Sequence, residues 1–142
     1  MPAVLPLRLL AEDVEDLAIV AAALQDAVGK VGDFTYDAKT RQLVLGLNRY
    51  RWEAKGRRRV RCGLQIASVL SVKSRNIRRA PKDAVVVLLT IAFAPEDLPG
   101  GVITLTFAGG GDLAVAVECI DVTLVDVSAA WPTTSTPAHD GD

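Results

Sequence analysis

The pattern of apolar and polar positions along this 142-residue chain changes its period twice. Leucines alternate with other residues over 5–9, which predicts a short first strand. Between Val14 and Val28 the apolar residues recur at steps of three and four, which is the period of one helix face. Asp13 is suited to cap such a helix and Gly29 to end it. The sequence therefore predicts an amphipathic helix over 14–28.

From residue 30 to about residue 117 the pattern is typical of strands separated by turns. Strands are expected over 31–36, 42–52, 59–66, 84–93, 102–107 and 113–117. The nearly continuous apolar run at 84–93 predicts a central strand buried on both faces. The stretch 73–83 contains Asn76 and Pro81 and is too polar to be expected as a strand. Glycines 109–111 lie between strand-like segments, which favours a hairpin turn over a phosphate-binding loop.

The end of the chain is ambiguous between helix and strand. Apolar residues at 120, 124, 127 and 131 would line one side of a closing helix, whereas Val122, Thr123 and Val125 also suit a strand. A helix is the favoured interpretation. Residues 132–142 have no apolar periodicity and are expected to form a flexible polar tail.

Together these elements predict an α+β fold in one globular domain over residues 1–131. It would be a bent antiparallel sheet of six or seven strands, packed by the N-terminal amphipathic helix and closed by a C-terminal helix. This outline could accommodate a pleckstrin-homology-like half-barrel, although a helix before the strands departs from the usual order of that fold.

Composition places the chain among globular proteins, because half of its residues are apolar. No apolar run is long enough to span a membrane, and Glu12 and Asp13 come too early for a secretory signal peptide, so a cytoplasmic protein is expected. Cys62 and Cys119 have no metal-binding or redox spacing. They are expected to be two buried free thiols.

Few residues are suited to catalysis. His139 is the one histidine and lies in the polar tail, so a histidine-dependent catalytic triad or metal site is not expected. The carboxylates of 12–16 and 118–126 are more typical of a helix start and a solvated polar face than of acid–base catalysis or cation binding. We predict no catalytic residue, no metal and no cofactor.

Charge is strongly segregated, although the net charge is only -1. Twelve of the 16 Lys and Arg residues fall between Arg49 and Lys82, where Glu53 is the one acid. The rest of the chain carries 4 basic and 16 acidic residues. A clustered patch of this kind indicates an anionic partner, because scattered charges cancel where clustered ones do not.

The arginines near residue 50 suggest a specific geometry. If 53–57 turns one strand back onto the next, Arg49 faces Arg61 and Arg51 faces Arg59 on one side, while Tyr50 and Trp52 join the core on the other. Opposed like charges need counter-charge, either from the protein's own flanking carboxylates or from a bound partner. This arrangement argues against a platform on which bases stack beside arginines. Basic residues of the following loop would extend the patch: Arg75, Arg78 and Arg79.

Several short motifs resemble a known family. They are Arg8-Leu-Leu-Ala-Glu-Asp-x-x-Asp-Leu17, Leu24-Gln-Asp-Ala-Val28, Asn48-Arg-Tyr-Arg-Trp-Glu53, Val117-Glu-Cys-Ile120, Ala130-Trp-Pro132 and Pro137-Ala-His-Asp140. Together they are similar to a family of short bacterial proteins called domain of unknown function 2948, over nearly the whole chain. The resemblance implies no activity, cofactor or catalytic residue.

The sequence thus favours a non-enzymatic, cytoplasmic binding or regulatory module. Its partner would be an acidic protein or a nucleic-acid backbone, docked through Arg49, Arg51, Arg59, Arg61, Arg75, Arg78 and Arg79. One alternative is a structural protein that self-associates, with acidic and basic parts meeting between subunits. The other is an enzyme that acts on an anionic substrate.

Overall fold

The computed structural model describes residues 7–52, 58–78, 84–127 and 131–132. Its elements in chain order are β1 (Arg8–Ala11), α1 (Val14–Ala23), β2 (Val28–Lys30), the short 3-10 helix η1 (Val31–Asp33), β3 (Phe34–Asp37), β4 (Gln42–Tyr50), β5 (Arg58–Ile66), β6 (Val69–Arg75), β7 (Val85–Pro95), β8 (Gly101–Phe107), β9 (Asp112–Val117), β10 (Val122–Asp126) and β11 (Trp131–Pro132).

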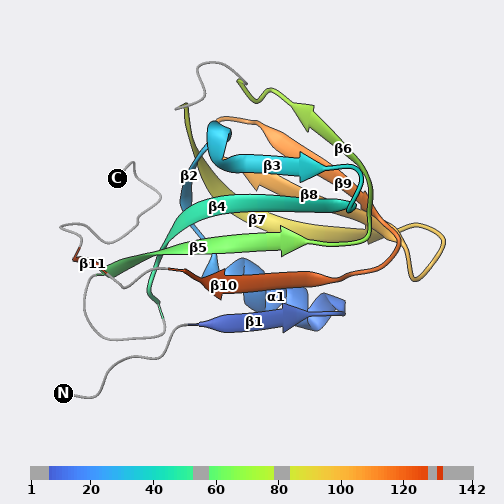
Figure 1. Cartoon of the computed structure of the whole chain (residues 1–142), viewed down its shortest axis with the longest axis horizontal. Coiled ribbons are helices and arrows are strands. Elements are labelled where there is room, and N and C mark those ends of the chain that lie inside the picture. Colours follow the sequence, from blue (N-terminus) through green and yellow to red (C-terminus); the bar gives the residue numbers. More distant parts are fainter. Residues whose placement is uncertain (1–6, 53–57, 79–83, 128–130, 133–142) are drawn as a thin grey trace.

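One continuous antiparallel sheet contains all eleven strands. Its order is β1-β10-β5-β4-β2-β7-β8-β9-β6, with β3 added beside β4 and β11 beside β5. The sheet folds over itself, so that β3, β4, β5 and β10 lie in front of β7, β8 and β9 in the view of Figure 1. The three-residue strand β2 joins the two halves, because it pairs with β4 on one side and with β7 on the other.

The hydrophobic core fills the space between the two halves. Inward-facing residues of β4 and β5 alternate with outward-facing ones, as in Leu43, Leu45 and Leu47. The facing half contributes residues such as Ile103, Leu105 and Phe107 of β8. Helix α1 contacts β1 and β7 and covers the lower end of this core in Figure 1.

Helix α1 begins as predicted but ends earlier than predicted. Asp13 caps it, since its Oδ1 accepts a hydrogen bond from the backbone N–H of Asp16 at 2.8 Å. The helix stops at Ala23 because Asp26 adopts a φ of 62° and its N–H bonds the carbonyl of Leu88 on β7. Gly29 therefore does not end the helix. It lies in β2, where a Cβ would come within 2.7 Å of the Leu47 side chain.

The predicted C-terminal helix is wrong. Residues 122–126 form β10, which pairs with β5 on one side and with β1 on the other. Val122 and Leu124 are buried, while Thr123 and Val125 between them are only half-buried. The two-residue alternation and the β-branched side chains prevail over the weaker helical spacing.

The predicted sheet was also too small. The strands expected over 59–66, 102–107 and 113–117 are confirmed, and the one expected over 42–52 is present but ends at Tyr50. The strand expected over 31–36 is wrong at its start, because Val31–Asp33 form η1 and β3 begins at Phe34. The expectation that 73–83 contains no strand is wrong at its start, because β6 runs to Arg75. The interpretation of 84–93 as a strand buried on both faces is wrong too, since only Leu88 and Ile91 of β7 are buried. The protein is mostly β, with one α-helix among the described residues, rather than α+β.

The pleckstrin-homology-like outline included a C-terminal helix and is not adopted. The described residues after β9 contribute the strands β10 and β11 to the sheet, and no helix. Within the described residues, no helix is long and apolar enough to cross a membrane. The predicted polar tail begins at residue 132, but Pro132 lies in β11. Residues 133–142 of that tail lie outside the described residues.

Candidate functional site

The pairing of β4 with β5 decides which arginines lie together. Asn48 pairs with Arg61, Arg49 with Val60, and Tyr50 with Arg59. This register differs by one residue from the predicted one, in which Arg49 faced Arg61. A shift of one residue moves a side chain to the other face of the sheet. Arg49 consequently points into the core, whereas Arg59 and Arg61 lie on the outer face, which is the face turned away from the core.

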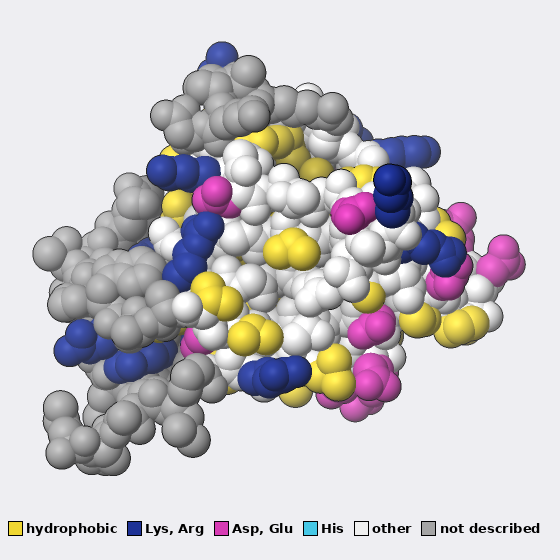
Figure 2. Space-filling model, viewed as in Figure 1, with side chains coloured by type: hydrophobic (Ala, Val, Ile, Leu, Met, Phe, Trp, Pro, Cys, Tyr) yellow, Lys and Arg dark blue, Asp and Glu magenta, His cyan; other side chains and the backbone are white. Residues whose placement is uncertain are grey.

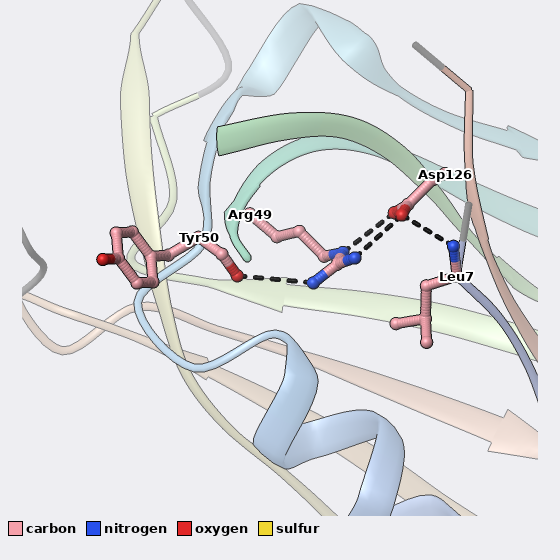
Figure 3. A network of polar contacts seen from close by, with 4 residues as sticks. All are labelled: Leu7, Arg49, Tyr50 and Asp126. Atoms are coloured by element: carbon pink, nitrogen blue, oxygen red, sulfur yellow. Dashed lines mark hydrogen bonds and ion pairs between the residues drawn. The ribbon is translucent and has the colours of Figure 1, made fainter. Parts of the chain in front are cut away.

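Arg49 makes a buried ion pair with Asp126 of β10. Its Nε donates to Asp126 Oδ1 at 2.8 Å and its second terminal nitrogen donates to Oδ2 at 2.8 Å. The Arg49 side chain is 0% exposed and that of Asp126 is 4% exposed. Figure 3 shows the fork-shaped arrangement, in which the Arg49 guanidinium also reaches the carbonyl of Tyr50 and Asp126 accepts the backbone N–H of Leu7 at 2.8 Å. Arg49 is therefore neutralised internally, which is one of the two alternatives for its counter-charge.

Cys62 lies on β5 next to this ion pair, because it is the residue directly opposite Asp126 in the pairing of β5 with β10. Burial raises the pKa of the Cys62 thiol from its ordinary 9.0 to about 12, while Arg49 lowers it and Asp126 raises it further. The thiol thus stays protonated and is not activated as a nucleophile. Both cysteines are free, as predicted, but Cys119 is only half-buried.

Arg61 and Arg59 lie on the outer face of β5. Arg61 forms an ion pair with Asp33 at 2.9 Å and contacts the Asn48 side chain at 3.3 Å. Arg59 donates to the carbonyl of Asn48 at 3.4 Å. Arg61 thus has a carboxylate of this chain as counter-charge, in a setting far more exposed than that of Arg49.

Of the two aromatic residues at the end of β4, Trp52 does not belong to the core, contrary to the prediction, whereas Tyr50 is buried. Tyr50 lies on the outer face, where it pairs with Arg59, and its ring centroid is 4.6 Å from that of Trp52. Trp52 is 42% exposed. Arg58, the first residue of β5, is also exposed, and by strand alternation its side chain leaves β5 on the face opposite that of Arg59. We call Tyr50, Trp52 and Arg59, together with the exposed Arg58 at the end of β5, the hairpin patch; Figure 2 shows basic side chains gathering on this side of the molecule, at the left of the view.

The remaining predicted site residues are not part of the hairpin patch. Arg51 follows β4 and is half-buried. Arg75 ends β6, on the far edge of the sheet, where it pairs with Asp112 at 2.6 Å. Arg78 lies three residues beyond it and is exposed, and Arg79 lies outside the described residues. The basic segment is therefore divided between two places in the fold.

The carboxylates that were weighed as candidate acids have structural partners or exposed positions. Asp13 caps α1, and Glu118 forms an ion pair with the exposed Arg41. Asp126 was grouped with a solvated polar face, yet it is the buried partner of Arg49. The signal that could have identified it is its place at the end of an alternating strand. Among the described residues no group of three or more His, Cys, Asp or Glu side chains could hold a metal ion.

A family model described as protein of unknown function, DUF2948, matches residues 7–139. The chain belongs to this family. The match includes every described strand and helix, so the resemblance seen in the short motifs is confirmed. No curated protein and no solved structure matches the chain. The match thus establishes which family the chain belongs to, but the description of the family names no activity.

Proposed function

We propose that this protein is a binding module that docks an acidic segment of a partner protein through the hairpin patch. The observation that carries the proposal is the exposed Trp52, 42% accessible, which packs on Tyr50, the residue paired with Arg59, at the strand end where Arg58 is also exposed. Tryptophan, tyrosine and arginine are the residues that most often supply the binding energy of protein interfaces. An exposed tryptophan held by a second ring is therefore suited to anchor a partner.

Two contacts orient side chains of the patch. The Trp52 ring contacts that of Tyr50, which is 7% exposed, and this contact reduces the side-chain freedom that is lost when Trp52 is covered. Arg59 is oriented by its contact with the Asn48 carbonyl. A partner carboxylate would meet the Arg59 guanidinium in this orientation, and paired charges of this kind fix orientation and speed association.

The charge distribution favours an acidic protein over a nucleic-acid backbone. Arg49, Arg61 and Arg75 each have an aspartate of this chain as partner. Binding to a phosphate backbone depends on many cations spread along a track, and Asp33 lies beside the outer-face arginines. A short acidic segment with an apolar residue needs only a few cations and one aromatic anchor.

The test uses Trp52 as its own reporter. Trp131→Phe leaves Trp52 as the one tryptophan, and fluorescence is followed as two probes of equal charge are added: a Trp-free peptide rich in Glu and Asp that carries one leucine, and an oligothymidine. The peptide is expected to shift the emission to shorter wavelength, and its affinity to fall with added salt. Circular dichroism verifies that Trp131→Phe preserves the fold.

A charge-reversed pair provides the control. Arg58→Glu with Arg59→Glu is expected to weaken peptide binding at least about tenfold. Arg8→Glu with Lys39→Glu changes the net charge equally at exposed sites elsewhere and should leave the affinity unchanged. Tighter binding of the oligothymidine, or equal losses in the two double variants, would contradict the proposal.

A further inference from the structure

Within the part of the chain that the structure describes, the bent sheet does not close between β3 and β6. Each of these strands has one hydrogen-bonded neighbour there, β4 for β3 and β9 for β6. Between them lies a cavity of about 560 Å³, which we call the groove. Its walls come from both halves of the sheet and from the adjoining η1: Val31, Gly32, Phe34, Tyr36, Leu43, Val72, Ser74, Ile77 and Leu113. In Figure 2 apolar side chains are visible at the top of the view, where the groove opens.

The walls of the groove are mainly apolar, and its size is that of a ligand pocket. Sites for small molecules usually measure about 300–1,000 Å³ and combine apolar walls with a few polar groups. Here Tyr36 and Ser74 contribute hydroxyl groups, while Phe34 is held in place by stacking on Phe107 at 6.0 Å. A second cavity of about 170 Å³ shares Val31 and Ile77 with the groove and extends it.

Positive charge borders the groove on the β6 side. Arg78, which is exposed, lines the second cavity. Lys73 lies on the opposite face of β6, because it alternates with the groove residues Val72 and Ser74. The nearby carboxylates have other partners: Asp33 pairs with Arg61, Asp112 pairs with Arg75, and Asp37 accepts the backbone N–H of Lys39. An apolar groove with a cation at its border is complementary to a molecule that has a hydrocarbon chain and an anionic end.

We propose that the groove binds a single-chain fatty carboxylate. Its hydrocarbon chain would lie against Phe34, Val72 and Leu113, and its carboxylate would reach Arg78, a guanidinium being suited to hold a carboxylate through two hydrogen bonds. This site is separate from the hairpin patch, so neither proposal depends on the other.

The two open strand edges suit this ligand better than an extended peptide. Strand β3 has only four residues, and β6 is interrupted between Val69 and Ser71 and carries Lys73. Short strands, irregular pairing and edge lysines are the devices by which proteins discourage strand addition. The backbone edges are thus poorly suited to a peptide, whereas the apolar walls between them remain open.

The first test is a titration of the unmodified full-length protein with laurate, at laurate concentrations below the critical micelle concentration. Calorimetry and amide NMR both monitor the binding. Saturable binding at one molecule per chain is expected, with shifts at Phe34, Tyr36, Val72 and Ile77 and none in α1. Absence of binding, or shifts centred on α1, would overturn the proposal. So would an alternating apolar peptide that binds the groove when laurate does not.

Matched variants test where the hydrocarbon chain of laurate and its head group bind. Ile77→Asp is expected to weaken laurate binding at least about tenfold, because it places a charge on the apolar wall. Leu70→Asp, on β6 but 54% exposed, should have little effect on the affinity. Thermal unfolding verifies that both variants fold, and the NMR result on the unmodified chain stands without them. Equal affinities in the two variants would contradict the assignment of the wall.

The head group is tested by charge reversal. Arg78→Glu is expected to weaken laurate binding about tenfold while leaving the affinity for dodecanol, which has no charge, nearly unchanged. Arg8→Glu, at an exposed site elsewhere, is the control of equal charge. If the two variants bind laurate equally, the assignment of Arg78 is wrong.

Discussion

Arg49 and Arg61 lie on neighbouring strands but on opposite faces of the sheet, and their surroundings differ sharply. On the inner face, Arg49 is 0% exposed and its partner Asp126 is 4% exposed. On the outer face, Arg61 and Asp33 are 33% and 42% exposed. Both ion pairs have a close contact of less than 3 Å between nitrogen and oxygen. The comparison shows that the face of the strand, and not the distance between the charges, determines what each arginine contributes.

The two ion pairs contribute differently to stability because only one of them is in contact with solvent. Water and salt screen the Arg61–Asp33 pair, and water hydrates either charge if the pair is broken. Water does not reach the Arg49–Asp126 pair, so either partner alone would be a charge buried without its counter-ion. We therefore infer that Arg49 stabilises the fold, whereas the proposed docking of an acidic partner uses the outer face and the hairpin patch.

The largest effect is expected from Asp126→Ala. The substitution leaves the Arg49 guanidinium buried without its carboxylate and removes the acceptor of the Leu7 N–H. The free energy of unfolding in urea should fall by about 3–5 kcal/mol. Asp33→Ala, the matching change on the outer face, should cost less than about 1 kcal/mol. Equal losses would contradict the distinction between the faces.

The sequence predicted the elements better than it predicted the faces. The cap at Asp13 follows from the chemistry of its side chain, and the central strands follow from the alternation of apolar and polar residues. Both signals can be seen in short segments of the sequence. The register of β4 against β5 does not follow from alternation alone, because Arg49 continues the inward series of Leu45 and Leu47 although it is charged. Its partner Asp126 lies 77 residues away.

The groove and the C-terminal strand were missed for a related reason. The local pattern of 122–126 was compatible with both helix and strand, and pairing with β1 and β5, which no local pattern shows, favours the strand. The groove arises where β3 and β6 fail to meet, which depends on the path of the whole sheet. Tertiary context therefore contributes at both places.

A second prediction uses Cys62 beside the buried pair. Its thiol ionises near pH 9 when the chain is unfolded and near pH 12 when it is folded, so its contribution to stability is complete below pH 9 and is lost as the pH rises to 12. Within this window the slope due to Cys62 is at most about 1.4 kcal/mol per pH unit. Urea unfolding of wild type and Cys62→Ala at several alkaline pH values should show a steeper decline for wild type. Parallel curves would contradict the raised pKa.

Removing both partners of the buried pair sharpens the comparison. Arg49→Met combined with Asp126→Leu leaves no unpaired charge, and apolar replacements of buried ion pairs often preserve stability. The double variant should lie within about 2 kcal/mol of wild type and be more stable than Asp126→Ala. Urea denaturation of the two variants measures this. A double variant less stable than Asp126→Ala would show that packing, and not charge, dominates at this site.

The smallest effect on stability is expected at the hairpin patch. Arg58→Glu with Arg59→Glu changes exposed or half-buried side chains and should alter the free energy of unfolding by no more than about 1 kcal/mol. Thermal unfolding monitored by circular dichroism is sufficient for this measurement. A large destabilisation would assign these arginines to the fold in place of recognition.

The most direct test of the difference between the faces is urea unfolding of Arg49→Met and Arg61→Met side by side. Both substitutions remove one guanidinium from the β4–β5 pair and keep an unbranched apolar side chain. The account predicts that Arg49→Met loses about 3 kcal/mol or more, because Asp126 is left buried and charged, and that Arg61→Met loses less than about 1 kcal/mol. Equal losses, or a larger loss for Arg61→Met, would contradict it.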